Sequence, residues 1–203
     1  MKRLLTAILF LLPLALTAQD NTWEQQSTGA PGVNPDAKYL AGAVTEIDGH
    51  VVFEATIQAP GKSKAQIYDI VQQEMLRMTK EPGQFEQSRL TIESPDSGLV
   101  VGNYQEWLVF KNKPLNLDRT RLFYQLVADC RDGEVDLKMM RIVYLYDEER
   151  NPTTYKAEEW ITDKYGLTKK QNKLSRVSGK FRRKTIDRKD YLFSKMEEML
   201  NKE

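Results

Sequence analysis

The chain has 203 residues, 40% of them hydrophobic and 9% aromatic, and its 30 Lys and Arg nearly balance its 29 Asp and Glu. These values are ordinary for a globular protein and exclude a wholly disordered chain, a collagen and a coiled-coil rod. The single Cys excludes an internal disulfide framework, and one Cys with one His excludes a structural zinc site built from four such ligands.

The chain begins with a pattern typical of a secretory signal peptide. Residues 1–19 have a positive head, Lys2 and Arg3, then an apolar run over 4–16, then small residues before a polar stretch. The run is shorter than the roughly 20 residues that span a bilayer, and Pro13 interrupts it; a retained membrane anchor is the less favoured alternative. No Cys follows the run, so a lipoprotein is not expected. We expect a periplasmic or extracellular protein that does not span the membrane after cleavage.

Two regions follow the expected cleavage site. Residues 20–38 contain two Gly and two Pro, few apolar residues and no periodicity, a composition that indicates a flexible leader. Residues 39–203 show no internal repeat, and their length suits one domain.

The domain opens with a short hairpin and a strand. Asp48-Gly49 is a strong turn pair and predicts a hairpin between residues 44–47 and the strand that follows. Residues 51–58 alternate between apolar and polar side chains, as in a strand with one buried face.

A helix is predicted next. Ser63 and Gln66 form a capping box, and apolar residues at helical spacing follow over 67–78. Pro82-Gly83 then marks the end of the helical pattern.

Period-two patterning follows the helix for about sixty residues and predicts four strands. Turn signals separate the runs, among them Asp132-Gly133. The connections are too short for crossovers, so neighbouring strands must pair antiparallel. The expected strands are 90–92, 99–110, 121–128 and 135–146.

The C-terminal part is less regular. Residues 155–162 suggest one more edge strand, and 169–184 a basic loop with a strand near Phe181. Helical spacing returns from Asp187, with Thr185 or Asp187 as the cap. The expected fold class is α+β: a curved antiparallel sheet of about five to six strands with two helices packed on one face, in the order β-α-β-β-β-β-α.

Residue types suited to catalysis are few. His50 lies beside a predicted turn and Cys130 at a strand end, and nothing in the sequence brings them together. Adjacent carboxylates such as Glu158 and Glu159 point to opposite faces of a strand, so they do not form the pair that glycoside hydrolysis needs. The sequence contains no phosphate loop, dinucleotide turn, calcium loop or nucleophile elbow. We therefore expect no catalytic residue, cofactor or metal site.

Charge is distributed unevenly along the chain. Residues 169–203 carry twelve Lys and Arg against five Asp and Glu, whereas residues 20–168 carry 16 against 24. Such a separation can attract an anionic partner, or it can reflect a basic tail that lies on an acidic body, which is the favoured interpretation. An envelope protein or an anionic glycan or lipid fits an exported protein as partner, and no nucleic acid is expected. The candidate residues for binding an anionic partner are Lys180, Arg182, Arg183 and Lys184.

Eight stretches of sequence, in collinear order, carry a resemblance to a known family. They are Tyr39–Val44, Glu46–Phe53, Ala59–Gly61, Glu106–Phe110, Leu117–Leu122, Arg141–Tyr146, Ala157–Asp163 and Gly179–Asp187. The chain resembles an exported family known as domain of unknown function 4468, with a TBP-like fold, over roughly residues 39–200. The resemblance implies a curved antiparallel sheet with two helices and supplies no catalytic or ligand residue, since fold does not imply function.

Three functions are compatible with these features. We expect an exported, non-enzymatic binding or interaction module of the cell envelope. The first alternative is a carrier that holds a small apolar ligand between helix and sheet. The second, less favoured, is a hydrolase that uses two carboxylates.

Overall fold

The computed structural model describes residues 21, 23–24, 34–114 and 116–202, so the expected signal peptide lies outside the described residues. The strands are β1 (Glu46–Ile47), β2 (His50–Val51), β3 (Phe53–Gln58), β4 (Arg89–Ser94), β5 (Leu99–Lys113), β6 (Asn116–Arg131), β7 (Glu134–Tyr146) and β8 (Thr153–Lys156). The helices are α1 (Lys64–Met78), α2 (Asp163–Gly166) and α3 (Gly179–Leu200), with 3₁₀ turns η1 (Ala37–Tyr39) and η2 (Ala157–Glu159).

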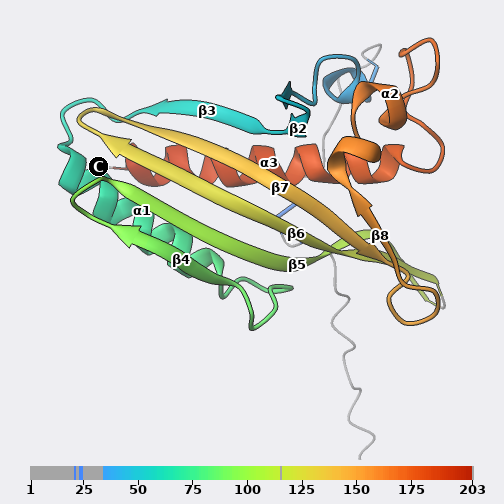
Figure 1. Cartoon of the computed structure of the whole chain (residues 1–203), viewed down its shortest axis with the longest axis horizontal. Helices are drawn as coiled ribbons and strands as arrows, with labels where there is room; N and C mark the ends of the chain where they lie inside the picture. Colours follow the sequence, from blue (N-terminus) through green and yellow to red (C-terminus); the bar gives the residue numbers. More distant parts are fainter. Residues whose placement is uncertain (1–20, 22, 25–33, 115, 203) are drawn as a thin grey trace, which may run out of the picture.

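One antiparallel sheet forms the body of the domain. Its strand order is β3-β7-β6-β5-β4, and β8 also pairs with β7. β3 pairs with the first part of β7 and β8 with the last part, so the two strands follow each other along one edge. Helices α1 and α3 lie on one face of the sheet, behind it in Figure 1. The α+β class and the two helices on one face are confirmed.

The alternation of side chains explains why one face of the sheet is covered. In β6, Leu122, Tyr124 and Leu126 are buried, whereas Arg121 and Phe123 between them are partly exposed. This is the period of two that a strand with one covered face requires. The register of β6 against β7 shifts between Phe123 and Gln125, which is a β-bulge and bends the sheet there.

Helix α1 begins as the sequence predicts. The Ser63 backbone N–H donates to Oε1 of Gln66 at 2.9 Å, and the Gln66 backbone N–H donates to Oγ of Ser63 at 3.4 Å, which completes the capping box. The helix buries Ile67, Val71 and Met75 against the sheet. The predicted hairpin around Asp48-Gly49 is also present, as the β1–β2 pair.

The second long helix starts earlier than expected. α3 begins at Gly179 rather than at Asp187, and Phe181 lies inside it instead of in a strand. Neither Thr185 nor Asp187 caps the helix, whose N-cap position is Ser178.

The cause of this error is the composition of the buried face of α3. Phe181, Thr185 and Leu192 lie on that face at helical spacing, but Arg182 and Arg188 are buried among them. These two arginines interrupt the run of apolar residues at helical spacing. An Arg counts as polar and exposed when a sequence is analysed for hydrophobic periodicity, so the helical pattern is not visible there.

The last strand is also shifted from its expected place. β8 covers Thr153–Lys156 rather than 155–162, because Ala157 begins a 3₁₀ turn. Ala157 and Ile161 are fully buried, so the chain leaves the sheet edge to insert these side chains into the core.

Two described residues of the expected flexible leader, 20–38, pack on the domain: Asn21 and Trp23. Trp23 is only 8% exposed and belongs to the hydrophobic core. The Asn21 side chain donates to the carbonyl of Val109 at 2.7 Å and accepts from its N–H at 2.9 Å, as a neighbouring strand would. Asn21 and Trp23 are thus tied to the sheet by these contacts.

Candidate functional site

Arg182, one of the four candidate binding residues, is fully buried. Its guanidinium donates to the backbone carbonyls of Tyr39 at 2.6 Å, Leu40 at 2.6 Å and Ile161 at 2.7 Å. It also pairs with Asp163 at 2.7 Å. Arg182 thus ties α3 to the start of the domain and to α2, and its charge does not reach the surface.

The other three candidates pair with carboxylates elsewhere in the chain. The pairs are Lys180–Asp118 at 2.7 Å, Arg183–Asp36 at 2.6 Å and Lys184–Glu24. The structure therefore places all four residues on the first turns of α3, but gives each an internal anion. For these four, the favoured interpretation of a basic tail lying on an acidic body describes the fold.

A buried ion network on α3 was missed by sequence reasoning. Arg188 is fully buried, and its Nε lies 2.8 Å from a carboxylate oxygen of Glu106, which is itself 2% exposed. Its Nη2 lies 3.0 Å from Glu81. Burial raises the pKa of Glu106 above its usual value, and the charge of Arg188 opposes this. The sequence signal was an Arg between Thr185 and Leu192 on the helical stripe.

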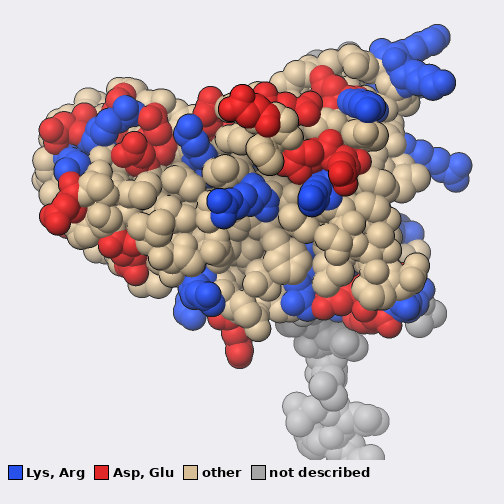
Figure 2. Space-filling model, viewed as in Figure 1, with Lys and Arg blue, Asp and Glu red and all other residues tan. Residues whose placement is uncertain are grey.

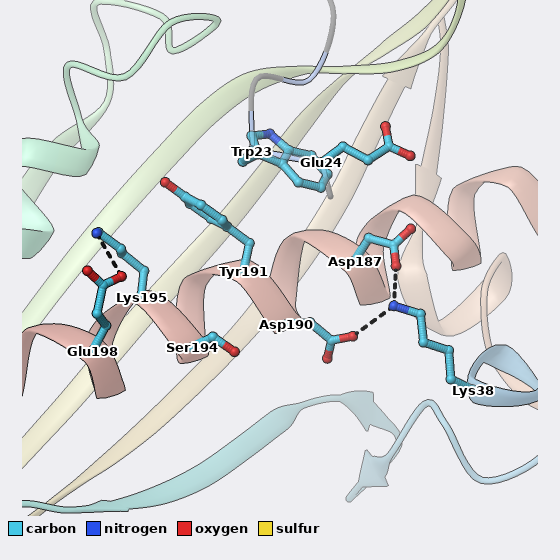
Figure 3. Close-up of a pocket in the computed structure, with 9 residues that line it drawn as sticks. All are labelled: Trp23, Glu24, Lys38, Asp187, Asp190, Tyr191, Ser194, Lys195 and Glu198. Atoms are coloured by element: carbon cyan, nitrogen blue, oxygen red, sulfur yellow. Dashed lines mark hydrogen bonds and ion pairs between the residues drawn. The ribbon is translucent and has the colours of Figure 1, made fainter. Parts of the chain in front are cut away.

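Aromatic rings close this network from solvent. Trp23 and Tyr191 lie 5.3 Å and 5.1 Å from the Arg188 guanidinium carbon, measured to the ring centroids. Figure 3 shows Trp23 above α3, on the side from which Tyr191 projects. The pocket beside them has a volume of about 200 Å³ and includes Lys38 paired with Asp187 at 2.7 Å. Its wall combines these rings with charged side chains, several of which pair with one another.

The segment from Lys164 to Ser178 carries a different kind of charge. It includes the end of α2 and starts before the loop that the sequence predicts at 169–184, and from here on we call this segment the basic loop. It contains five Lys and Arg and no Asp or Glu. All five are exposed, and within the described part of the chain none of them forms an ion pair. Figure 2 shows basic side chains projecting into solvent at the end of the molecule that carries α2. The five residues are Lys164, Lys169, Lys170, Lys173 and Arg176.

The uncovered face of the sheet carries a stack of aromatic and guanidinium groups. Arg119 lies 3.7 Å from the ring centroid of Trp107, and Arg121 lies 4.0 Å from that of Phe85. Arg121 also pairs with Glu148, so its charge is already neutralised.

The space between helices and sheet is filled by side chains. Fully buried side chains from α1, α3 and the strands meet there, which gives the carrier alternative no support. They include Ile67, Val71, Met75, Tyr104, Leu126, Met139 and Met196.

The remaining chemically distinctive side chains do not form a site. Cys130 is fully buried, and burial raises the pKa of its thiol to about 12, so it stays protonated at neutral pH. The His50 side chain is exposed and lies 3.8 Å from Glu158. Among the described residues, no cluster of His, Cys, Asp and Glu has metal-ligand geometry. Within the same residues, no helix has the length and hydropathy needed to cross a membrane.

Comparisons with known proteins agree with this fold. The model of the family "domain of unknown function (DUF4468) with TBP-like fold" matches residues 53–145. A crystal structure of a DUF4468 family protein from Bacteroides ovatus is 39% identical, covers 84% of this chain and 98% of its own, and superposes with a TM-score of 0.76.

A second crystal structure, of a TBP-like protein from Parabacteroides distasonis, is 16% identical. It covers 78% of this chain and 97% of its own, with a TM-score of 0.60, and shows the fold alone. No curated protein matches the chain. With 39% identity over nearly the full length of a family member, the chain belongs to the DUF4468 family, a domain of unknown function with a TBP-like fold.

Proposed function

We propose that this protein is an exported, non-enzymatic binding module of the cell envelope that holds an anionic partner through its basic loop. The observation that carries the proposal is the contrast between two parts of one basic region. On α3, the cations from Lys180 to Lys184 pair inside the chain, whereas the five cations of the basic loop face solvent. Charge that is not neutralised within the fold is available to an anionic partner.

Binding is favoured over catalysis because the groups suited to acid, base or nucleophilic chemistry serve the fold. Glu81 and Glu106 share Arg188 under a cover of aromatic rings. Cys130 is buried in β6 with its thiol protonated. These contacts support a module without reactive groups, and residues 1–19 support its export.

The role of the basic loop is tested on a polyanion that has no lipid layer. The mature chain from Asp20 is passed over immobilised long-chain polyphosphate in a salt gradient, beside a variant with Lys169→Gln, Lys170→Gln and Lys173→Gln. We expect the variant to elute at clearly lower salt, because three unpaired charges are lost and electrostatic attraction between exposed groups is screened by salt.

A matched control removes the same charge from other exposed sites, with Lys80→Gln, Lys111→Gln and Lys113→Gln. This control should elute close to the wild type. Equal elution of loop variant and control would contradict a specific role of the loop.

The export part is tested by N-terminal sequencing of the protein from its host, which is expected to begin at Asp20.

A further inference from the structure

The basic loop exposes apolar side chains next to its cations. Val177 is 60% exposed and Tyr165 is 41% exposed. The Ser178 hydroxyl donates to the carbonyl of Tyr165 at 2.5 Å, and the Ser175 N–H donates to that of Gly166 at 2.8 Å. These bonds hold the two ends of the loop together, with Tyr165 at one end and Val177 at the other. We call these two exposed side chains the apolar patch.

The loop has a defined conformation. Leu167 and Leu174 form an isolated antiparallel bridge, and the Thr168 N–H donates to the carbonyl of Lys173 at 3.0 Å. Leu167 is buried and anchors this turn on the domain. The lysines at the tip therefore project from a fixed turn, and binding orders little additional backbone.

We infer that the partner of the basic loop is the surface of an anionic lipid bilayer. The inference rests on the proposed function, since it names the partner of the same loop. Cations alone would bind any polyanion. The exposed Tyr and Val beside them contribute to binding only where an apolar layer lies behind the negative charges. Tyr side chains favour the headgroup level of a bilayer, and aliphatic side chains the acyl boundary beneath it.

The position of the loop suits contact with a flat surface. It lies at one end of the molecule together with α2, and the outermost side chains there are basic (Figures 1 and 2). Attachment through this end keeps the uncovered face of the sheet, with Trp107 and Arg121, open to solvent. The protein would thus sit on the bilayer as a peripheral domain.

The test compares vesicles with immobilised polyphosphate. Sedimentation is measured with vesicles of equal parts phosphatidylglycerol and phosphatidylcholine, and with phosphatidylcholine alone. We expect the mature chain to bind only the anionic vesicles. The variant with Lys169→Gln, Lys170→Gln and Lys173→Gln should bind them about 100-fold less, because each cation near an anionic surface contributes about fivefold.

The apolar patch separates a bilayer from other anions. The pair Tyr165→Ser and Val177→Ser should weaken vesicle binding about tenfold or more, yet leave elution from polyphosphate unchanged. The control pair is Leu76→Ser and Ile92→Ser, two other exposed apolar residues, at 48% and 45% exposure, which should leave vesicle binding unchanged.

Each outcome separates the two proposals. A wild type that is retained on polyphosphate but does not bind anionic vesicles overturns the bilayer inference and leaves the proposed function standing. The inference is also overturned if the control pair Leu76→Ser and Ile92→Ser weakens vesicle binding as much as Tyr165→Ser and Val177→Ser do. It is overturned as well if the latter pair loses its retention on polyphosphate. A wild type that binds neither polyphosphate nor anionic vesicles overturns both proposals.

Discussion

The two arginines buried on α3 remain charged by different means. Arg182 uses its planar fork of donors on three backbone carbonyls and one carboxylate, while Arg188 lies among carboxylates. A buried guanidinium needs such partners, because an unpaired charge in the interior costs several kcal/mol. Arg188 therefore specifies how α3 sits against the sheet, and Arg182 how it sits against the start of the domain and α2, in addition to any stability that they contribute.

The Arg188 network gives a prediction at the scale of single residues. Arg188→Ala is expected to lower the free energy of unfolding by about 3–5 kcal/mol, since Glu106 stays buried without its cation. Urea denaturation measures the loss, and Arg176→Ala on the exposed loop should stay within about 0.5 kcal/mol of the wild type.

The pH dependence of the same variant follows from Glu106. Because burial raises the pKa of Glu106 in the folded state, the unfolded chain binds fewer protons than the folded chain above the ordinary Glu value of 4.5. Stability from this group is fully present below that value and is lost as the pH rises through the folded-state pKa. Adding Glu106→Gln to Arg188→Ala should remove this fall of stability with rising pH. If the fall persists in the double variant, Glu106 is not its cause.

At the scale of elements, turns pin the ends of the strands. The carbonyl of Gly98, in the turn before β5, accepts a hydrogen bond from the Cys130 N–H at 2.9 Å. Gly98 has a φ of +79°, and a Cβ there would lie 2.3 Å from the carbonyl oxygen of Cys130. The turn therefore requires glycine for two reasons, the dihedral angle and the contact.

A matched pair of variants separates these reasons. Gly49 has nearly the same φ, +78°, but a Cβ there meets nothing within 4 Å. Gly49→Ala should cost about 1–2 kcal/mol from the left-handed backbone alone. Gly98→Ala should cost about 1–3 kcal/mol more, because backbone must move to relieve the contact. Equal urea midpoints for the two variants would show that the contact with the Cys130 carbonyl is relieved at no cost in stability.

At the scale of the whole molecule, the fold includes the N-terminal segment. Trp23 enters the core from a segment that precedes the sheet, and Asn21 pairs with the backbone of Val109 on β5. Glu24 neutralises Lys184 on α3. The segment thus joins sheet and helix on the side where the Arg188 network is closed.

A truncation tests that contribution. A chain that starts at Asn34 lacks all three contacts and should be less stable than the chain from Asp20 by about 3–5 kcal/mol, the cost typical of removing a buried Trp. Trp23→Ala in the longer chain should reproduce most of the loss. Coincident urea transitions for the chains from Asp20 and Asn34 would mean that the segment does not pack in solution.

Patterns between near neighbours determined much of the fold from the sequence alone. The Ser63–Gln66 capping box, the Asp132-Gly133 hairpin and the alternation along β6 and β7 each depend on residues a few positions apart, which a sequence displays directly. The start of α3 was misplaced where buried arginines broke that pattern. The family resemblance stated from the sequence is confirmed by the comparisons.

Only the tertiary structure decided which charges are free. Arg183 pairs with Asp36 and Lys180 with Asp118, partners that the sequence places far away, whereas Lys169 in the same basic region pairs with none of the described residues. The side chains on α3 and in the basic loop look alike in sequence, because a lysine or arginine carries the same charge in either place. The fold alone brings an anion beside one cation and leaves another in water, so it relocates the candidate binding surface from α3 to the basic loop.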